Sequence, residues 1–373
     1  MKIGIFTQPL HTNYGGILQN YALQTVLKRM GHEPWTIRKK DSVYRYCRSK
    51  VSRFVKDKIL HKDNIPPTQA EYNIIAKNLN EFVEKNINTT EKINLYKKKG
   101  ELEKYDFDAF IVGSDQVWRP RYNRNILNNY LDFLDENSKT KKIAYAASFG
   151  VDKWEYSHEL TTQCRGLAQS FDTISVREES AIDLCKKNLH VEAKQVLDPT
   201  LLLDENDYLS LSNQRFRPKK KTLAAYVLDV STEKQKIVND ISKKFGLETI
   251  TIMPTRKYTR KNKNYINECI YCPVSAFIET IYQSDYVVTD SYHGTIFSII
   301  FNKPFISISN ERRGISRFNA LLGMFSLKNR LISIDDHIQN IEDKNPIDYK
   351  SINQKIHLEK KKSLSYIVNN FKH

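Results

Sequence analysis

One short stretch in the last quarter of the chain combines residues that can bind an anion and transfer a proton. Asp290-Ser291-Tyr292-His293-Gly294 lies between two hydrophobic runs. We expect a strand before it and a helix beginning at Thr295, and the free N–H groups and positive dipole of a helix N-terminus suit a phosphate. His293 would hydrogen-bond or protonate that anion, with Gly294 and Thr295 beside it. The alternative is a capping loop in which the histidine only packs.

Arg177 follows another hydrophobic run, Thr173–Val176, which we expect to be a strand. At a strand end its guanidinium could form paired hydrogen bonds with a carboxylate or a phosphate. The alternative is an ion pair with Glu178 or Glu179 on the following helix, which would make the arginine structural.

A second group of arginines follows the predicted strand Pro304–Ile308. Guanidinium groups in such a place form either an anion trap or a solvated turn, and their closeness to the His293 helix favours the trap. The residues concerned are Arg312, Arg313 and Arg317, with Gly314 among them.

Two loops nearer the N-terminus also follow predicted strands. Asn13-Tyr14-Gly15-Gly16 comes after Ile3–Gln8, and Gly113-Ser114-Asp115-Gln116 comes after Phe107–Val112. The first loop either admits a ligand against its backbone or caps a helix running from about Ile17 to Met30. It has neither the GxGxxG nor the GxxxxGK[ST] spacing, which argues against a dinucleotide or an ordinary ATP site. Because ligands of parallel sheets bind beyond the carboxyl ends of strands, all these stretches together predict one site.

Hydrophobic runs of strand length alternate with amphipathic helical stretches along the chain. This alternation is typical of α/β proteins with open parallel sheets. The remaining strands we expect are Lys142–Ala147, Gln195–Leu197, Leu223–Leu228, Glu248–Met253 and Tyr286–Thr289, and the helices are Ser231–Phe245, Ser275–Gln283, Thr295–Asn302 and Tyr349–Phe371.

The elements fall into two series, which predicts two Rossmann-like domains facing each other across a cleft. We place the N-terminal domain at residues 1–205 and the C-terminal domain at 206–340, with the break in the polar stretch Asp204–Lys221. Residues 41–100 lack strand patterning and are interpreted as a helical, basic insertion. Residues 341–373 are expected to form a helix that packs back on the N-terminal domain.

Composition restricts the partners and the compartment. The net charge of +16 predicts an anionic partner, for which nucleic acid, anionic lipid and phosphorylated small molecules all qualify. The basic segment Arg38–Lys62 interleaves cations with apolar residues, which suits either a helix on an anionic membrane or a solvated basic face. No run approaches the roughly 20 apolar residues of a membrane span. The N-terminus resembles a strand rather than a signal peptide, so we expect a cytoplasmic protein.

The five cysteines fit that compartment, since they form an odd and scattered set: Cys47, Cys164, Cys185, Cys269 and Cys272. The single CxxC pair lacks the second pair typical of zinc sites. Pro273 follows it, where a redox motif would open a helix. We expect reduced thiols, no metal site and no bound cofactor.

Six stretches, in order, resemble motifs of the polysaccharide pyruvyltransferase family. They are Asn13–Gln24 (NYGGILQNYALQ), Val112–Trp118 (VGSDQVW), Ala144–Gly150 (AYAASFG), Ser175–Glu178 (SVRE), Leu197–Thr200 (LDPT) and Thr289–Thr295 (TDSYHGT). The likeness runs from Met1 to about Phe325, with residues 41–100 variable. It implies a GT-B-like fold, phosphoenolpyruvate as the donor, and a sugar of a bacterial surface polysaccharide, either free or lipid-linked, as the acceptor.

The resemblance also assigns roles to individual residues. The family's donor-site arginine matches Arg177, and its histidine matches His293. The two residues before that histidine are usually Arg-Leu, but here they are Ser291-Tyr292, so one donor contact is missing. A family lysine falls by spacing at or near Arg313, and the two side chains are not equivalent.

Ketal formation from phosphoenolpyruvate needs cations for its phosphate and carboxylate and a general acid for its methylene carbon. His293 is the first candidate for the acid, with Asp290, Glu178 and Asp115 as weaker ones. We expect the donor to contact Arg177, His293, Gly294, Thr295, Arg312 and Arg313. The acceptor side of the cleft is expected to comprise Asn13, Tyr14, Gly15, Gly16, Ser114, Asp115 and Gln116.

Two other functions compete with this one. A GT-B glycosyltransferase would use a nucleotide sugar in the same fold, but no acidic residue that would hold ribose hydroxyls is identifiable. A nucleic-acid-binding protein would explain the charge, but no nucleic-acid-binding motif occurs and the basic residues are scattered. We therefore expect no nucleic-acid partner.

Overall fold

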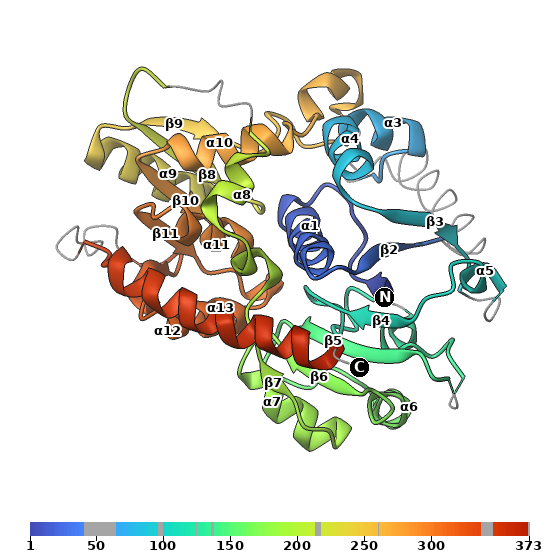
Figure 1. Ribbon diagram of the computed structural model, residues 1–373. Coiled ribbons are helices and arrows are strands. Elements are labelled where there is room, and N and C mark those ends of the chain that lie inside the picture. Colours follow the sequence, from blue (N-terminus) through green and yellow to red (C-terminus); the bar gives the residue numbers. More distant parts are fainter. Residues whose placement is uncertain are drawn as a thin grey trace.

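The computed structural model describes residues 1–40, 65–95, 100–123, 125–135, 138–212, 218–259, 261–336 and 346–371, apart from the side chains of Gly100 and Arg312. Two parallel sheets, each flanked by helices, lie side by side (Figure 1). The architecture is α/β with two Rossmann-like halves, as the alternating pattern predicts.

The N-terminal half is built on a seven-stranded sheet with the order β3-β2-β1-β4-β5-β6-β7. Its strands are β1 (Lys2–Phe6), β2 (Glu33–Lys39), β3 (Thr89–Ile93), β4 (Ala109–Val112), β5 (Lys141–Ala147), β6 (Thr173–Val176) and β7 (Lys194–Gln195). Its helices are α1 (Tyr14–Arg29), α3 (Gln69–Ile75), α4 (Lys77–Asn86), α5 (Gly100–Glu103), α6 (His158–Ala168) and α7 (Ser180–Leu184), and α8 (Glu205–Leu209) leads to the second half.

The C-terminal half is built on a five-stranded sheet with the order β12-β11-β10-β8-β9. Its strands are β8 (Thr222–Tyr226), β9 (Glu248–Thr251), β10 (Tyr286–Thr289), β11 (Phe305–Ile308) and β12 (Leu331–Ile332). Its helices are α9 (Thr232–Phe245), α10 (Val274–Gln283), α11 (Tyr292–Ile300) and α12 (Ser316–Met324). The chain reverses direction across the sheet between β8 and β10, and in the first sheet between β1 and β4. Such switch points are where open parallel sheets bind ligands.

An apolar core continues from one half into the other. Tyr14 of α1 stacks on Phe277 of α10 with ring centroids 4.6 Å apart, and its hydroxyl donates a hydrogen bond to the carbonyl oxygen of Cys272. Phe297 of α11 belongs to the same buried cluster as Ile3 of β1. The two halves are thus held together by packing as well as by the connecting chain.

The last helix, α13 (Tyr349–Phe371), contacts both halves (Figure 1, red). At its start, the Tyr349 hydroxyl donates to the carbonyl oxygen of Lys303. Further along, the Ser363 hydroxyl accepts a hydrogen bond from the backbone N–H of Leu197, and Tyr366 hydrogen-bonds with Thr173. The helix therefore ties β6 and β7 to the C-terminal half.

The expectation that residues 41–100 lack strands is wrong. β3 pairs with β2 at the edge of the first sheet, although α3 and α4 precede it as helices. Within β3 only Thr90 and Ile93 are buried, because an edge strand faces solvent and needs no continuous apolar run. Most of the basic segment Arg38–Lys62 lies outside the described residues, so its membrane interpretation stays a prediction. Among the residues that the structure describes, no helix has the length and apolar character needed to cross a membrane.

Candidate active site

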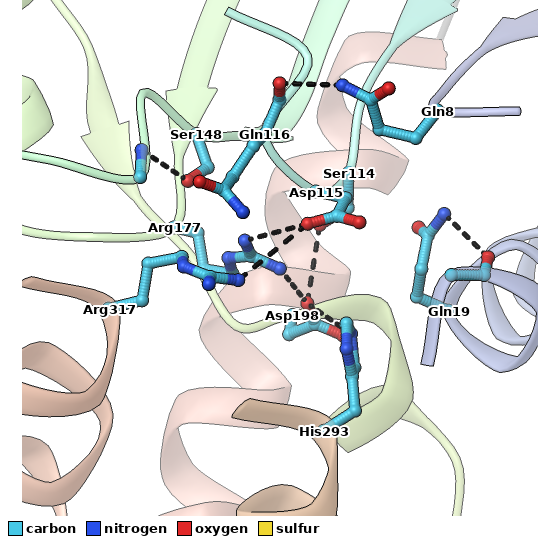
Figure 2. Close-up of polar contacts among 12 residues, drawn as sticks. Gln8, Gln19, Ser114, Asp115, Gln116, Ser148, Arg177, Asp198, His293 and Arg317 are labelled. Atoms are coloured by element: carbon cyan, nitrogen blue, oxygen red, sulfur yellow. Dashed lines mark hydrogen bonds and ion pairs between the residues drawn. The ribbon is translucent and has the colours of Figure 1, made fainter. Parts of the chain in front are cut away.

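Seven buried side chains from both halves meet where the strand ends of the two sheets face each other. We call them the junction cluster: Asp115, Arg177, Glu178, Asp198, Tyr292, His293 and Arg317. Figure 2 shows Asp115, Arg177, Asp198, His293 and Arg317 among them. Asp115 follows β4, Arg177 follows β6 and Asp198 follows β7, whereas His293 stands in the first turn of α11 after β10. The carboxyl ends of parallel strands thus bring together residues that are far apart in sequence.

Arg177 is the most highly connected cation of the cluster. Its Nη1 donates to Asp198 Oδ2 at 2.7 Å and its Nη2 to Asp115 Oδ1 at 3.4 Å. Glu178 Oε2 lies 3.9 Å from Arg177 Nε, beyond hydrogen-bonding distance. The ion pair with Glu178 that the structural alternative predicted is therefore present at 3.9 Å, but Arg177 lies closer to Asp198 and Asp115.

The two aspartates are held as carboxylates. Burial alone would raise the pKa of Asp198, but His293 and Arg177 together with a hydrogen bond from Thr200 lower it well below its usual range. Burial likewise opposes ionisation of Asp115, and Arg177, His293 and Arg317 outweigh it and lower its pKa. Both groups accept hydrogen bonds as carboxylates and have no proton to donate at neutral pH.

His293 reaches the cluster from the C-terminal half. Its Nε2 lies 3.6 Å from Asp198 Oδ2, and that nitrogen makes no hydrogen bond. The imidazole packs directly on Gly15 at the start of α1, where a β-carbon would overlap Nδ1. Gly15 therefore contributes space rather than a functional group, and any side chain there would displace the histidine.

Arg317 and Tyr292 complete the cluster. The guanidinium carbons of Arg177 and Arg317 lie 4.5 and 5.2 Å from the centroid of the Tyr292 ring, within the range of cation–π contacts. Arg317 Nη1 is 3.8 Å from Asp115 Oδ1. Figure 2 shows the two guanidinium groups side by side and directed toward Asp115.

Several polar atoms in the cluster are buried without a hydrogen-bond partner. They are Arg177 Nε, Arg317 Nε, His293 Nε2 and Glu178 Oε2. Nearly all buried polar groups in folded proteins are hydrogen-bonded, so a group of exceptions in one place calls for an explanation. A polar ligand that enters the junction would supply the missing partners. A small pocket bordered by Arg177, Asp198, Tyr292 and Met324 lies beside the cluster.

Three of the other predicted site residues are already engaged elsewhere. Asp290 accepts hydrogen bonds from the backbone of Leu228 and Asp229 and a charged one from Lys234 at 2.6 Å, so it stabilises the loop after β8 instead of facing His293. The backbone N–H of Gly294 is capped by the Ser291 hydroxyl, because α11 begins at Tyr292 and not at Thr295. The Thr295 hydroxyl hydrogen-bonds with Ser307.

The arginines after β11 do not all lie in the same surroundings. Arg313 forms a two-point ion pair with Asp229 at 2.6 Å, and both side chains are half-exposed. The side chain of Arg312 lies outside the described residues. Of the two whose side chains are described, Arg317, which we grouped with them but did not assign to donor binding, reaches the cluster.

The residues predicted for the acceptor side also lie in different places. The Ser114 hydroxyl lies 3.4 Å from Asp198 Oδ2, beside Asp115. Gln116 bonds to Arg119 rather than to the cluster. Tyr14 packs between the halves, while Asn13 is the N-terminal cap residue of α1 without a side-chain capping bond, and Gly16 lies in the first turn of that helix.

Glu178 was predicted as a weaker acid candidate, and its carboxylate is fully buried. Its Oε1 accepts hydrogen bonds from the Ser148 hydroxyl at 2.7 Å and the Gly150 N–H at 2.9 Å. These bonds hold the loop after β5 against the cluster, and Oε2 is left free on the side of Arg177.

A family model for polysaccharide pyruvyl transferase matches residues 13–312, which contain six of the seven cluster residues. The chain belongs to this family. No curated protein sequence matches it.

Solved structures resemble this member of the family in fold alone. The MnaA–UDP structure from S. aureus has a TM-score of 0.52 and 13% identity, and the match covers 100% of this chain and 98% of that one. A protein assigned as a UDP-N-acetylglucosamine 2-epimerase from Listeria monocytogenes has a TM-score of 0.52 and 11% identity, with 100% and 96% covered. The fold of the pyruvyl transferase is thus of the GT-B type, as the six motifs imply.

Sequence reasoning missed Asp198 and Tyr292 as members of the site, and it placed Arg317 in an expected anion trap without assigning it to donor binding. Asp198 carried a usable signal, because it is the polar residue at the end of a short strand, the same rule that selected Arg177. Arg317 was one of three neighbouring arginines, and the first turn of α12 directs its side chain toward the cluster. Nothing in the sequence pattern indicated that Tyr292 would lie between two cations.

Proposed function

We propose that this protein transfers a pyruvyl group from phosphoenolpyruvate to a sugar of a bacterial surface polysaccharide or of its lipid-linked precursor, forming a pyruvate ketal. The proposal is supported by membership of the pyruvyl transferase family and by the chemistry of the junction cluster. A buried site with guanidinium groups and an imidazole suits a small, highly anionic donor.

The observation that carries the proposal is the set of unpartnered nitrogen atoms in the cluster. Arg177 Nε, Arg317 Nε and His293 Nε2 are all buried and all lack an acceptor. Leaving such groups unsatisfied costs about 1–3 kcal/mol each, and more when the group is charged. A donor that carries both a carboxylate and a phosphate provides enough acceptor oxygens to satisfy them together.

The reaction requires one proton at the methylene carbon of the donor. His293 gives a proton to that carbon, and the adjacent carbon becomes an oxocarbenium-like centre. Two acceptor hydroxyls then form two C–O bonds to it while the C–O bond to phosphate breaks. Of the two hydroxyl protons released, one restores His293 and the other leaves with the phosphate, so protons and bonds balance.

The assignment of the acid to His293 follows from its neighbours. Asp115 and Asp198 have lowered pKa values and are therefore poor proton donors. Asp290 is bound to Lys234 and the β8 loop. Glu178 is bound through Oε1 to the Ser148 hydroxyl and the Gly150 N–H, where it holds the loop after β5. We therefore assign the proton donor to the His293 imidazole, a common general acid, and Asp198 at 3.6 Å orients it.

The compartment belongs to the proposal as well. Phosphoenolpyruvate is an intracellular metabolite, so we place the reaction in the cytoplasm. A lipid-linked acceptor would bring the enzyme to the inner face of the membrane, and the net charge of +16 is compatible with peripheral contact there.

The test is to incubate purified protein with phosphoenolpyruvate and glycan fragments and to measure phosphate release and the mass of the product. We expect phosphate release only with an acceptor, and a product heavier by one pyruvyl ketal. An acceptor in which one hydroxyl of the bridged pair is methylated is the matched control and should yield no ketal. Cleavage of a nucleotide sugar without any pyruvylated product would instead identify a glycosyltransferase.

A further inference from the structure

We propose that Arg317 is a second donor-binding guanidinium, which acts together with Arg177 and is held in place by Tyr292. This inference rests on the proposed function, because it assigns the anionic groups of that donor to two arginines. It begins from a difference between them. Arg177 has a close carboxylate at 2.7 Å, whereas the nearest carboxylate oxygen that Arg317 meets is 3.8 Å away.

The position of Arg317 is determined by well-anchored backbone. The residue lies in the first turn of α12, and its Nη2 donates to the carbonyl oxygen of Arg313 at 2.6 Å. The preceding Ser316 hydroxyl donates to the carbonyl oxygen of Gly150 in the N-terminal half at 2.9 Å. Gly314 packs so closely on Gly150 that a β-carbon would overlap its carbonyl oxygen. The loop thus delivers the arginine to the junction in a defined place.

The contacts of Arg317 leave part of its guanidinium without an acceptor. The side chain is buried, its residue being 5% exposed, and its Nε has no hydrogen-bond partner. Burial, together with the positive charge of Arg177, lowers its pKa from the usual value. The carboxylates of Asp115 and Glu178 favour the charged form, but Asp115 is 3.8 Å away and the guanidinium donates instead to the carbonyl oxygen of Arg313. A buried guanidinium whose Nε lacks an acceptor is costly unless a ligand supplies one.

Tyr292 explains how two like charges can remain close together. Each guanidinium faces the ring of Tyr292, whose negative π surface partly offsets their repulsion. The ring therefore keeps both guanidinium groups directed into the junction before an anion binds. A donor with two anionic groups can then bind to both arginines without first ordering either side chain.

The experiment is calorimetric titration of phosphoenolpyruvate into the full-length protein and its variants. We expect Arg317→Ala to weaken donor binding by about 10- to 100-fold, the range of a lost charged hydrogen bond. Arg317→Lys keeps the charge but lacks the planar guanidinium that can form paired hydrogen bonds. Its donor affinity should lie between that of wild type and that of Arg317→Ala. In turnover assays KM for the donor should rise with little change in KM for the acceptor, a split that general loosening of the fold would not produce.

Arg256→Ala is the matched control. Arg256 lies in the same half, its guanidinium carbon is 4.7 Å from the Tyr265 ring centroid, and it pairs with Glu268, but it is on the surface. It should bind the donor within twofold of wild type. Donor binding by Arg317→Ala or Arg317→Lys that equals wild type would overturn the inference while leaving the proposed function intact. Failure of the wild-type protein to bind phosphoenolpyruvate would overturn both.

Discussion

Arg177 and Arg313 both form short ion pairs with an aspartate, yet their surroundings differ completely. The Arg177–Asp198 pair is 2.7 Å long with side chains 2% and 0% exposed, while the Arg313–Asp229 pair is 2.6 Å long with side chains 40% and 47% exposed. Both arginines follow a strand of a parallel sheet. Proximity to a strand end therefore places a cation near the site but does not decide whether water or protein surrounds it.

The difference arises from what covers each pair. The loop after β6 is covered by the C-terminal half, which brings Tyr292 and His293 against Arg177. The loop after β11 carries Arg313 at its outer side and Arg317 at its inner side. In a low-dielectric junction each charge interacts strongly with the others, whereas solvent screens the exterior pair.

The comparison predicts that Arg177→Ala is the most damaging single change. It would leave Asp198 buried without its closest cation, and breaking a buried pair in this way costs about 3–5 kcal/mol of unfolding free energy. That is a large part of the roughly 5–15 kcal/mol typical of a protein domain. We expect a folded protein with a lower urea midpoint and clearly weaker phosphoenolpyruvate binding. Reduced stability with unchanged donor affinity would make Arg177 a purely structural residue.

The second prediction concerns His293→Asn. Asparagine keeps some hydrogen bonding but cannot act as the acid, so turnover should fall by roughly 100-fold, the usual contribution of a general acid. Donor affinity should fall much less, and steady-state kinetics beside calorimetry measure both. Normal turnover with weaker donor binding would make His293 a phosphate ligand only.

Gly15→Ala provides a complementary control for that histidine. A methyl group at position 15 would overlap Nδ1 and push an otherwise intact imidazole away from Asp198. Turnover should fall in this variant as well, although no titratable group is lost. Full activity would show that the contact between α1 and His293 does not position the acid.

Much of the architecture could be predicted from sequence because hydrophobic periodicity reflects burial directly. Tyr286–Thr289 and Thr173–Val176 are strands at the expected residues, and α13 has the expected ends. The N-terminal edge strand β3 could not be found in this way, because only Thr90 and Ile93 of its residues are buried. The start of α11 was placed three residues late, since Tyr292 and His293 were taken for loop residues.

The site was only partly predictable, because strand-end rules give the region but not the side-chain direction. They selected Arg177, Asp115 and His293, which do meet. They also selected Asp290, whose carboxylate is paired with Lys234 of α9 instead. Arg317 lies near Arg177 only because the two halves are in contact. No local sequence pattern contains that information.

Among these substitutions, Arg313→Ala should change stability and donor affinity least. This variant tests the exposed ion pair of the comparison, as Arg177→Ala tests the buried one. Its pair with Asp229 is half-exposed, and such surface pairs contribute about 0–1 kcal/mol to stability. The urea midpoint should therefore change little. Donor affinity should also remain within about threefold of wild type, because Arg313 bonds to Asp229 and not to the cluster. A loss of donor binding as large as that of Arg177→Ala would show that Arg313 turns inward when the donor arrives, and that exposure without ligand is a poor guide to which arginine binds it.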